Sequence, residues 1–321
     1  MKRILSGIQP TSKIHLGNYF GAIKQHIELQ EQGECFYFVA NYHALTSVND
    51  PKTLRENTLD IALDYLALGL DPEKACLFRQ SDVPEVTELT WLLSTVTGMG
   101  LLERAHSFKD KVAKGITPNV GLFTYPILMA ADILIYQSDL VPVGSDQLQH
   151  IEMAQDIAGY FNNTYGYVFK RPEALLSPTP KVPGTDGQKM SKSYHNTIPV
   201  FAEDSALRKA VMSIVTDSLP LEAPKDPDCN TVYRLYELFA SADEIAEMRN
   251  RFLSGGYGYG QAKRALLEKI DAYFAPARAR RKELASNLDY VEQVLRQGAQ
   301  KARHEAALTL KATRLACGLD T

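Results

Sequence analysis

Two lysines that flank a methionine and a serine form the segment of this sequence most able to do chemistry. They are Lys189 and Lys192, and Gly184 and Gly187 precede them in the chain. An ammonium group is a compact point charge that can follow a moving polyphosphate, and glycines supply the backbone freedom that a closing loop needs. The segment therefore indicates a mobile loop that can close over phosphate. A solvated loop with two surface lysines is the alternative that these residues alone leave open.

A second candidate segment, residues 9–18, lies between the first expected strand and the first expected helix. Backbone N–H groups and a helix N-terminus can face an anionic ligand at such a place, and Gly17 lets a flat base approach the backbone closely. A tight turn capped by Asn18 would explain the same residues. The sequence has no Walker lysine and no dinucleotide-type glycine fingerprint, which excludes those two nucleotide-binding classes.

Two aspartates are further candidates for ligand contacts. Asp132 interrupts the apolar stretch at residues 125–136, where a carboxylate is costly unless it finds a partner. An acceptor in such a place suits an N–H donor on an aromatic ligand, and a bond to the protein's own backbone is the alternative. Asp146 follows an expected strand, where it could accept from ribose hydroxyls or cap the next helix.

These segments require a scaffold that brings strand ends together. Continuous apolar runs predict strands, and apolar side chains at helical spacing predict the helices between them. The expected strands are residues 4–7, 35–40, 75–78 and 140–143. Strands that alternate with helices indicate an α/β fold with a Rossmann-like, doubly wound parallel sheet, in which ligands bind beyond the carboxyl ends of the strands.

The strand signal stops after Asn196, and the rest of the chain is expected to be helical. Proline and glycine breaks separate predicted helices at residues 206–215, 231–240, 242–253, 261–273, 276–296 and 301–317. The sequence thus predicts one domain at residues 1–196, which ends in the lysine loop, and a second at residues 197–321. Basic residues of the second domain form either an RNA contact or a solvated surface. They are Lys263, Arg264, Lys269, Arg278, Arg280, Arg281 and Lys282.

Composition limits the partners and cofactors that can be expected. The 321 residues are 45% hydrophobic and carry a net charge of −3, so a nucleic-acid partner would need a local basic patch and DNA is not expected. The four cysteines are far apart and no histidine pair accompanies them, which argues against zinc, an iron-sulfur cluster or a disulfide framework. The absence of a signal peptide or long apolar segment predicts a cytoplasmic protein with no membrane contact.

The order of the motifs resembles that of the class I aminoacyl-tRNA synthetases. HLGN at residues 15–18 comes first, GSDQ at residues 144–147 follows a later strand, and KMSKS at residues 189–193 ends the sheet domain. The detail is similar to the bacterial tryptophanyl-tRNA synthetases, and the likeness covers nearly the whole chain. It is carried by residues 7–11, 17–19, 102–104, 108–111, 125–126, 128–134, 141–144, 146–147, 150–152, 189–193 and 299–302.

The resemblance implies an ATP-dependent enzyme that activates L-tryptophan to tryptophanyl-adenylate and transfers it to tRNA(Trp). It implies a homodimer, ATP used with Mg²⁺, and an anticodon-binding role for residues 197–321, whose last helix can pack back on the catalytic domain. Residues 229–260 lack the clustered cysteines with which some relatives bind an iron-sulfur cluster. A tyrosyl-type synthetase and a non-catalytic, synthetase-like RNA-binding protein are the alternatives.

The resemblance also assigns roles to single residues. The implied ATP site comprises Gln9, Pro10, Thr11, Gly17, Asn18, Gly144, Ser145, Asp146, Val182, Lys189, Met190, Ser191, Lys192 and Ser193. The implied tryptophan site comprises Leu5, His43, Met129, Asp132, Val141, Val143 and Gln147, with Asp132 as the acceptor for the indole N–H. The implied catalytic residues are Lys192, Lys189, Lys111 and Gln9. Leu5, Ser107 and Ser145 depart from residues common in relatives, which affects the expected shape of the substrate pockets.

Overall fold

The computed structural model describes residues 1–11, 13–105, 119–177 and 181–320. Its contacts divide the chain into two compact units, each of which is described by itself. The sheet unit comprises residues 1–12, 25–177 and 284–321, and the helical unit comprises residues 13–24 and 178–283. The predicted functional division at residue 196 stays a prediction. Lys111 and Ser107 lie outside the described residues.

The sheet unit is built on a parallel sheet of five described strands in the order β3-β2-β1-β4-β5. The strands are β1 (Arg3–Ile8), β2 (Glu34–Val39), β3 (Ala75–Arg79), β4 (Leu140–Val143) and β5 (Glu173–Leu176). The order reverses direction at β1, whose two neighbours are β2 and β4, so the carboxyl ends of β1 and β4 flank a topological switch point. The predicted α/β fold is confirmed.

Strand β5 was not expected from the sequence. It lies at the end of the strand order and pairs with β4 from Leu140↔Glu173 to Val143↔Leu176. Its residues, EALL, are exposed or half-buried rather than enclosed on both faces. An edge strand of this kind lacks the continuous apolar run by which a central parallel strand is recognised, so the pattern that identified β1 to β4 could not identify β5.

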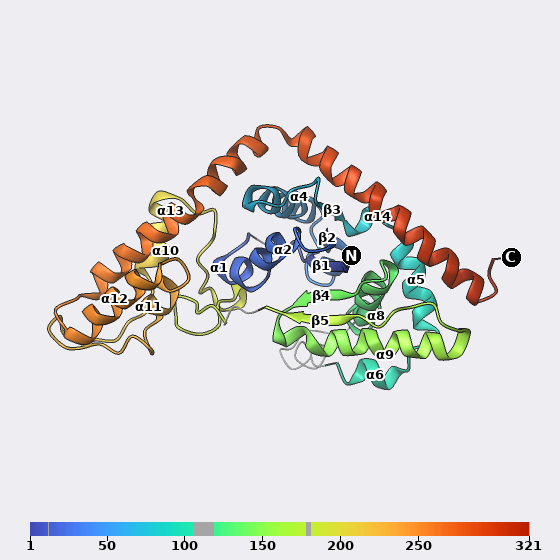
Figure 1. The fold of residues 1–321 in the computed structure, drawn as a ribbon, viewed down its shortest axis with the longest axis horizontal. Helices are drawn as coiled ribbons and strands as arrows, with labels where there is room; N and C mark the ends of the chain where they lie inside the picture. Colours follow the sequence, from blue (N-terminus) through green and yellow to red (C-terminus); the bar gives the residue numbers. More distant parts are fainter. Residues whose placement is uncertain (12, 106–118, 178–180, 321) are drawn as a thin grey trace. The chain divides into compact units, whose positions relative to one another are not determined.

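Helices cover the sheet and carry several predicted site residues. In the sheet unit they are most of α2 (Lys24–Leu29), α3 (Asn41–Ala44), α4 (Pro51–Leu68), α5 (Glu85–Ser94), α6 (Met99–Glu103), α8 (Val120–Ile135), α9 (Leu148–Tyr165) and α14 (Leu288–Ala316). Helix α8 packs between α5 and α9 (Figure 1). Helix α4 begins as the sequence predicts, with the Asp50 carboxylate accepting from Thr53 N at 2.7 Å, and ends at Gly69, whose φ is 115°.

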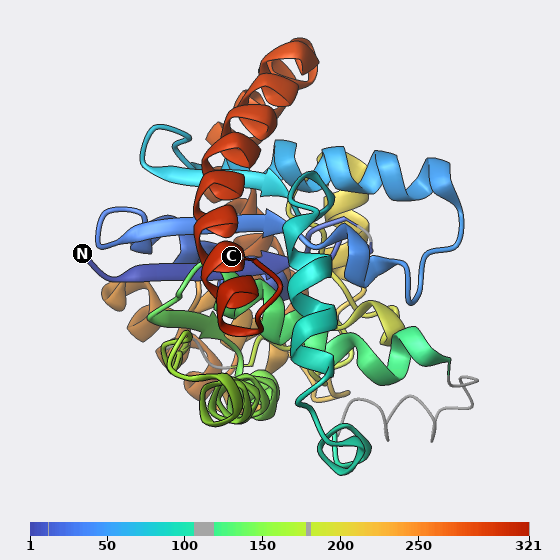
Figure 2. The same cartoon turned by 90° about the vertical axis from the view of Figure 1, so that its right-hand side faces the viewer.

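Helix α14 packs against β3 and beside α5 (Figure 2). Gly298 is the point of closest approach, because the Cys76 thiol donates to its carbonyl oxygen at 3.0 Å. A Cβ atom at residue 298 would lie 2.7 Å from the carbonyl carbon of Leu77 and would overlap its oxygen. A glycine in this helix therefore lets α14 contact the backbone of β3 directly.

Gly298→Ala is therefore expected to destabilise the protein by about 3 kcal/mol, because β3 or α14 must move to admit the methyl group. Gly159→Ala in α9 is the matched control, since a Cβ there meets no atom within 4 Å. The control should gain roughly 0.5–1 kcal/mol through its higher helix propensity. Urea unfolding of both variants measures the difference. A similar gain in stability for both would contradict the close approach at Gly298.

The helical unit has an aromatic core. It contains α1 (Leu16–Asn18), the π-helical turn η1 (Tyr19–Ile23), the 3₁₀ turn η4 (Lys192–Tyr194), α10 (Asp204–Met212), α11 (Thr231–Tyr236), α12 (Ala242–Ser254) and most of α13 (Tyr259–Ala285). Phe20 packs edge-on against Phe239 with ring centroids 5.2 Å apart, and Tyr19 packs edge-on against Phe274 at 5.0 Å. These rings join the first helical turns to α13 and to the residues that follow α11.

The predicted helix breaks near Pro276 and between residues 296 and 301 are wrong. Helix α13 continues through Pro276, and α14 runs unbroken from Leu288 to Ala316. Pro276 removes one helical hydrogen bond, but Phe274 and Arg278 stay buried on either side of it, so packing carries the helix across. The actual break lies at Asn287, whose side chain caps α14 by accepting from Tyr290 N.

Candidate active site

Two of the predicted ATP-binding segments lie at the same edge of the sheet. Gln9 and Pro10 directly follow β1, and Gly144 directly follows the neighbouring strand β4. Thr11 N donates to Gln9 O at 2.9 Å, which makes a tight turn after β1. A Cβ at Gly144 would lie only 2.7 Å from Asp146 Oδ1, so this glycine lets the carboxylate lie against the backbone. The edge thus presents exposed polar groups where a doubly wound sheet binds its ligand.

The residues expected around tryptophan belong to the elements beside this edge. Leu5 and Val141 are buried on β1 and β4, and Val143 ends β4. Met129 and Asp132 lie on α8, and His43 lies on α3. Gln147 ends the 3₁₀ turn η3 (Ser145–Gln147) that follows β4. All seven predicted residues therefore belong to the sheet unit.

Asp132 is the buried acid of this group, and only 3% of it is exposed. Its Oδ2 accepts from His43 Nε2 at 2.8 Å, and the side-chain amide of Gln80 donates to Oδ1 at 2.9 Å and to Oδ2 at 2.8 Å. Burial raises the pKa of Asp132, while the hydrogen bonds from His43 and Gln80 oppose that rise. Side chains hold this carboxylate, whereas the alternative expectation was a bond to the backbone.

Sequence reasoning missed Gln80. It follows β3 directly and begins the 3₁₀ turn η2 (Gln80–Asp82), so its backbone lies at the carboxyl end of a strand. A polar residue at that position was the available signal, since strand ends are where ligands of such sheets bind.

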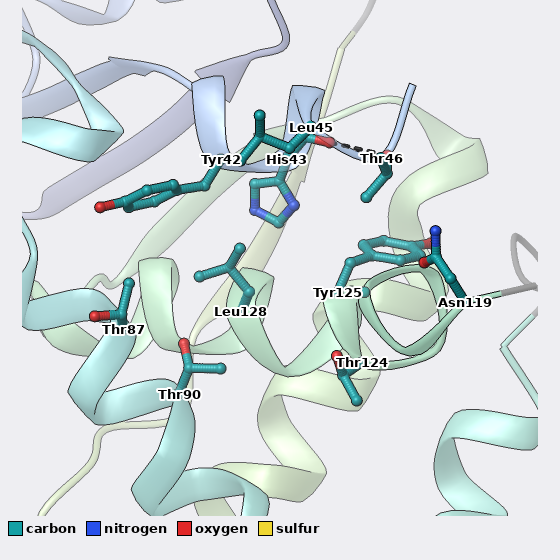
Figure 3. Close-up of a pocket in the computed structure, with 11 residues that line it drawn as sticks. Tyr42, His43, Leu45, Thr46, Thr87, Thr90, Asn119, Thr124, Tyr125 and Leu128 are labelled. Carbon is teal, nitrogen blue, oxygen red and sulfur yellow. Dashed lines mark hydrogen bonds between the residues drawn. The ribbon is translucent and has the colours of Figure 1, made fainter. Parts of the chain in front are cut away.

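A pocket of about 490 Å³ lies beside His43 (Figure 3). Its lining residues include Thr87, Thr90, Tyr125 and Leu128. Tyr125 packs edge-on against His43 with ring centroids 6.2 Å apart, and its hydroxyl lies 2.7 Å from His150 Nε2. The hydrogen bond between His43 and Asp132 therefore joins the buried carboxylate to a residue of the pocket wall.

Within the helical unit, the HLGN and KMSKS motifs contact each other. Gly17 N donates to Met190 Sδ at 3.4 Å, and a Cβ at Gly17 would lie 3.3 Å from Met190 Cβ. His15 caps α1, because its Nδ1 accepts from Asn18 N at 3.3 Å while Asn18 Oδ1 accepts from His15 N. The turn thus uses a reciprocal cap by both residues.

The charge of Lys192 acts on this cap. Burial, followed by the nearby Lys192 ammonium, lowers the pKa of His15 to about 4. His15 is therefore neutral at pH 7, as its role as an acceptor from Asn18 requires. Burial also lowers the pKa of Lys192 itself.

The lysine loop is ordered around Asn196, a residue that sequence reasoning passed over. Asn196 Oδ1 accepts from Ser191 N at 2.7 Å, and its Nδ2 donates to Asp186 Oδ1 at 2.7 Å and to Lys189 O at 3.2 Å. Gly184 lies so close that any Cβ there would overlap the Asn196 amide. Val182 O accepts from Met190 N at 2.9 Å. The loop is therefore a folded segment built on its own hydrogen bonds.

A family model described as "tRNA synthetases class I (W and Y)" matches residues 1–275. The chain belongs to this family. It is 58% identical over 318 residues to a protein from Rhodopirellula baltica named Tryptophan--tRNA ligase, covering 99% of both chains. It is also 58% identical over 321 residues to the protein of that name from Fusobacterium nucleatum, covering 99% of this chain and 98% of that one.

A solved structure resembles the whole synthetase. It is tryptophanyl-tRNA synthetase from Campylobacter jejuni, complexed with ADP and tryptophane. The TM-score is 0.93 at 48% identity, over 99% of this chain and 100% of that chain. The resemblance stated from the sequence is therefore confirmed, and this protein is an aminoacyl-tRNA synthetase. The roles assigned to single residues stay predictions, and that of Lys111 falls outside the described residues.

No group of three histidine, cysteine, aspartate or glutamate residues in the described ranges could hold a metal ion. Among the helices of those ranges, none has both the length and the apolar character needed to cross a membrane.

Proposed function

We infer that this synthetase is a tryptophan-tRNA ligase, which couples L-tryptophan to ATP and transfers the activated amino acid to tRNA(Trp). The observation that carries the inference is the 58% identity to tryptophan-tRNA ligases over 99% of the chain. The buried Asp132 carboxylate supports it, because a fixed acceptor favours a ring that donates an N–H. A ring without this donor leaves the acceptor unpaired.

The chemistry needs no covalent enzyme intermediate. The tryptophan carboxylate attacks the α-phosphorus of ATP, the bond to the bridging oxygen breaks, and pyrophosphate leaves with the electron pair. The protein's task is to hold the reactants in line and to stabilise charge on the leaving group. We assign the charge stabilisation to Lys192 and Lys189, with Lys111 as a further candidate. In the second step the terminal ribose hydroxyl of the tRNA attacks the acyl carbon and AMP leaves.

We assign nucleotide binding to the two strand ends and to the two contacting motifs. Gln9, Pro10 and Thr11 follow β1, and Gly144, Ser145 and Asp146 follow β4. We assign to Asp146 the role of accepting from ribose hydroxyls. Gly17, Asn18, Val182 and Met190 to Ser193 complete the assignment. Mg²⁺ enters with ATP, since this ion keeps several waters and binds mainly through substrate phosphates.

Charging of tRNA tests the function. The purified protein, supplied with ATP, Mg²⁺ and bacterial tRNA, is expected to attach labelled tryptophan and not labelled tyrosine. Attachment of tyrosine instead would establish the tyrosyl-type alternative. Failure to attach either amino acid, with a known synthetase active in the same assay, would favour the non-catalytic alternative.

We propose that residues 197–321 include the anticodon-binding domain. We consider the basic residues of α13, of which several bind the protein itself: Lys269 pairs with Glu244 at 2.6 Å, Lys282 pairs with Glu203 at 2.8 Å, and Lys263 donates to backbone carbonyls. Arg264 and Arg280 are exposed on α13. On this helix, these two arginines are therefore the strongest candidates for contact with tRNA phosphates.

The double variant Arg264→Ala/Arg280→Ala is expected to raise KM for tRNA and leave tryptophan-dependent pyrophosphate exchange unchanged. Each lost phosphate contact should also reduce the salt dependence of tRNA binding by roughly one unit of slope. Filter binding at several salt concentrations measures this. If tRNA binding by the double variant depended on salt concentration as steeply as binding by the wild type, the tRNA would contact other residues.

We propose that the enzyme works as a homodimer in the cytoplasm. Large apolar side chains are exposed on three neighbouring helices of the sheet unit, with Trp91 on α5 69% exposed, Met99 on α6 63% and Val120 on α8 78%. Such side chains are suited to contact with a second chain. The four cysteines are free thiols, which suits a reducing compartment. Light scattering should give twice the chain mass of 35.7 kDa, and a single chain mass would contradict the dimer.

A further inference from the structure

The carboxylate of Asp132 is only partly occupied by its protein partners. A carboxylate offers about four acceptor positions on its two oxygens. Oδ2 accepts from both His43 Nε2 and Gln80 Nε2, whereas Oδ1 accepts from Gln80 Nε2 alone. The remaining acceptor capacity therefore lies mainly on Oδ1.

The orientation of the Gln80 side chain is set by a backbone group. Its Oε1 accepts from Tyr42 N at 3.0 Å, and a backbone N–H can only donate. The amide oxygen must therefore face Tyr42, and the NH₂ group must face Asp132. This bond settles an assignment that is ambiguous for most glutamines. Gln80 is only 2% exposed, so no bulk water competes with these bonds.

A single amide nitrogen that bonds both carboxylate oxygens limits rotation of the carboxylate about its own axis. It also supplies hydrogen bonds to a charge that burial disfavours. His43 supplies the only other hydrogen bond to Asp132 that the described contacts show. Loss of Gln80 would leave the charge on Asp132 with half of its protein donors.

We propose that Gln80 is the positioning residue of the tryptophan site, which fixes the plane of the Asp132 carboxylate, keeps it ionised and leaves Oδ1 to accept the indole N–H. The proposal rests on the function inferred above and on the role of Asp132 in it. Gln80 acts through Asp132 and is not assigned a contact with tryptophan. It thus determines substrate specificity through Asp132, without a contact of its own with the substrate.

Other titratable groups surround Asp132 and enter any pH dependence. His43 on α3 bonds the carboxylate directly. Tyr136, which caps the C-terminus of α8, interacts electrostatically with both Asp132 and Glu85, which begins α5. Burial raises the pKa of Asp132, and the Gln80 and His43 bonds lower it. Because His43 and Tyr136 are present in every variant, differences between variants report on residue 80.

Two substitutions at Gln80 should move the pH profile in opposite directions. Gln80→Met has a similar shape and no donor, so Asp132 should become harder to ionise and KM for tryptophan should fall as pH rises. Gln80→Glu keeps an acceptor for Tyr42 N and places a second carboxyl group against Asp132. The two carboxyl groups should share a proton at low pH and repel when both ionise, so KM should rise as pH rises.

Ser81→Ala is the matched control from the same turn. Ser81 and Asn41 exchange two hydrogen bonds, of 2.7 Å and 3.0 Å, that join η2 to α3 without touching Asp132. This variant loses a bond between the same two elements and keeps both partners of the carboxylate. Its KM for tryptophan should change with pH as that of the wild type does. The variant therefore shows the effect of a loosened turn alone.

The test is tryptophan-dependent ATP–pyrophosphate exchange from pH 6 to 9, with benzothienylalanine, which has sulfur in place of the ring N–H, as a second substrate. Gln80→Met is expected to raise KM for tryptophan about tenfold at pH 7 and to leave KM for ATP unchanged. Its preference for tryptophan over the sulfur analogue should shrink. In Gln80→Glu, KM for tryptophan should change with pH in the opposite direction. If Gln80→Met does not fold, the pH profile of Gln80→Glu alone tests the proposal.

The proposal would be overturned if Gln80→Met preferred tryptophan over the sulfur analogue as strongly as the wild type does. It would also be overturned if KM for tryptophan changed equally in Gln80→Met and Ser81→Ala. Equal pH slopes for the two Gln80 variants would also overturn it. These outcomes differ from failure of the inferred function, in which the wild-type protein itself shows no exchange with tryptophan.

Discussion

Lys192→Ala is expected to lower kcat for tryptophan-dependent pyrophosphate exchange by about a hundred- to a thousandfold. This is the range measured for loss of one donor to a developing negative charge in a preorganised site, roughly 3 kcal/mol. Lys192 begins η4 directly after Ser191, whose N–H is fixed by Asn196. The side chain is half-buried and near His15, so its position is defined by the folded loop.

KM for tryptophan should change little in Lys192→Ala, because the lysine is assigned to the leaving group. Lys209→Ala, which removes an exposed lysine from α10 in the same unit, is the control for the loss of one positive charge. Exchange kinetics with saturating and with limiting ATP separate an effect on kcat from an effect on KM for ATP. A wild-type kcat in Lys192→Ala would show that another group stabilises the pyrophosphate.

Asp132→Asn is expected to lower kcat/KM for tryptophan by roughly 10- to 100-fold, since a hydrogen bond to a buried charged acceptor contributes about 1.5–3 kcal/mol. The amide is almost the same size as the carboxylate, so the apolar surroundings on α8 need not repack. It lacks the charge, however, and its NH₂ group must face one of the donors His43 and Gln80. Steady-state exchange with tryptophan and with benzothienylalanine measures the effect.

The loss should be specific to substrates with a ring N–H, because only they use the acceptor. Asp156→Asn on the exposed face of α9 removes an acid of the same type from the same unit and should leave both substrates unaffected. An equal loss for tryptophan and its sulfur analogue in Asp132→Asn would mean that the carboxylate supports the fold rather than selects the substrate.

Local patterns in the sequence were sufficient for strands β1 to β4 and for the main motifs. Strands β1 to β4 are short apolar runs, and Asp132 is the one acid in an apolar helix, so each can be recognised from its neighbours. Gln80 and Asn196 could not be recognised in this way. Gln80 is defined by a bond to a residue 52 positions away, and Asn196 by its fit against the backbone of the lysine loop. Such contacts are set by tertiary packing.

The helical part shows a second limit, which concerns proline. Pro276 predicts a helix break from local geometry, but packing on both sides of it keeps α13 continuous. The break at Asn287 was not expected, although asparagine is a good N-cap. Burial outweighed the local cost of the proline here.

Exchange of labelled pyrophosphate into ATP by the wild-type protein, without tRNA and with one amino acid at a time, tests the central claim most directly. Tryptophan is expected to drive rapid exchange, while tyrosine, phenylalanine and benzothienylalanine should each give a kcat/KM at least tenfold lower, since none offers a ring N–H to Asp132. Exchange driven equally well by tyrosine or by benzothienylalanine would contradict the claim that this enzyme selects tryptophan through a buried acceptor.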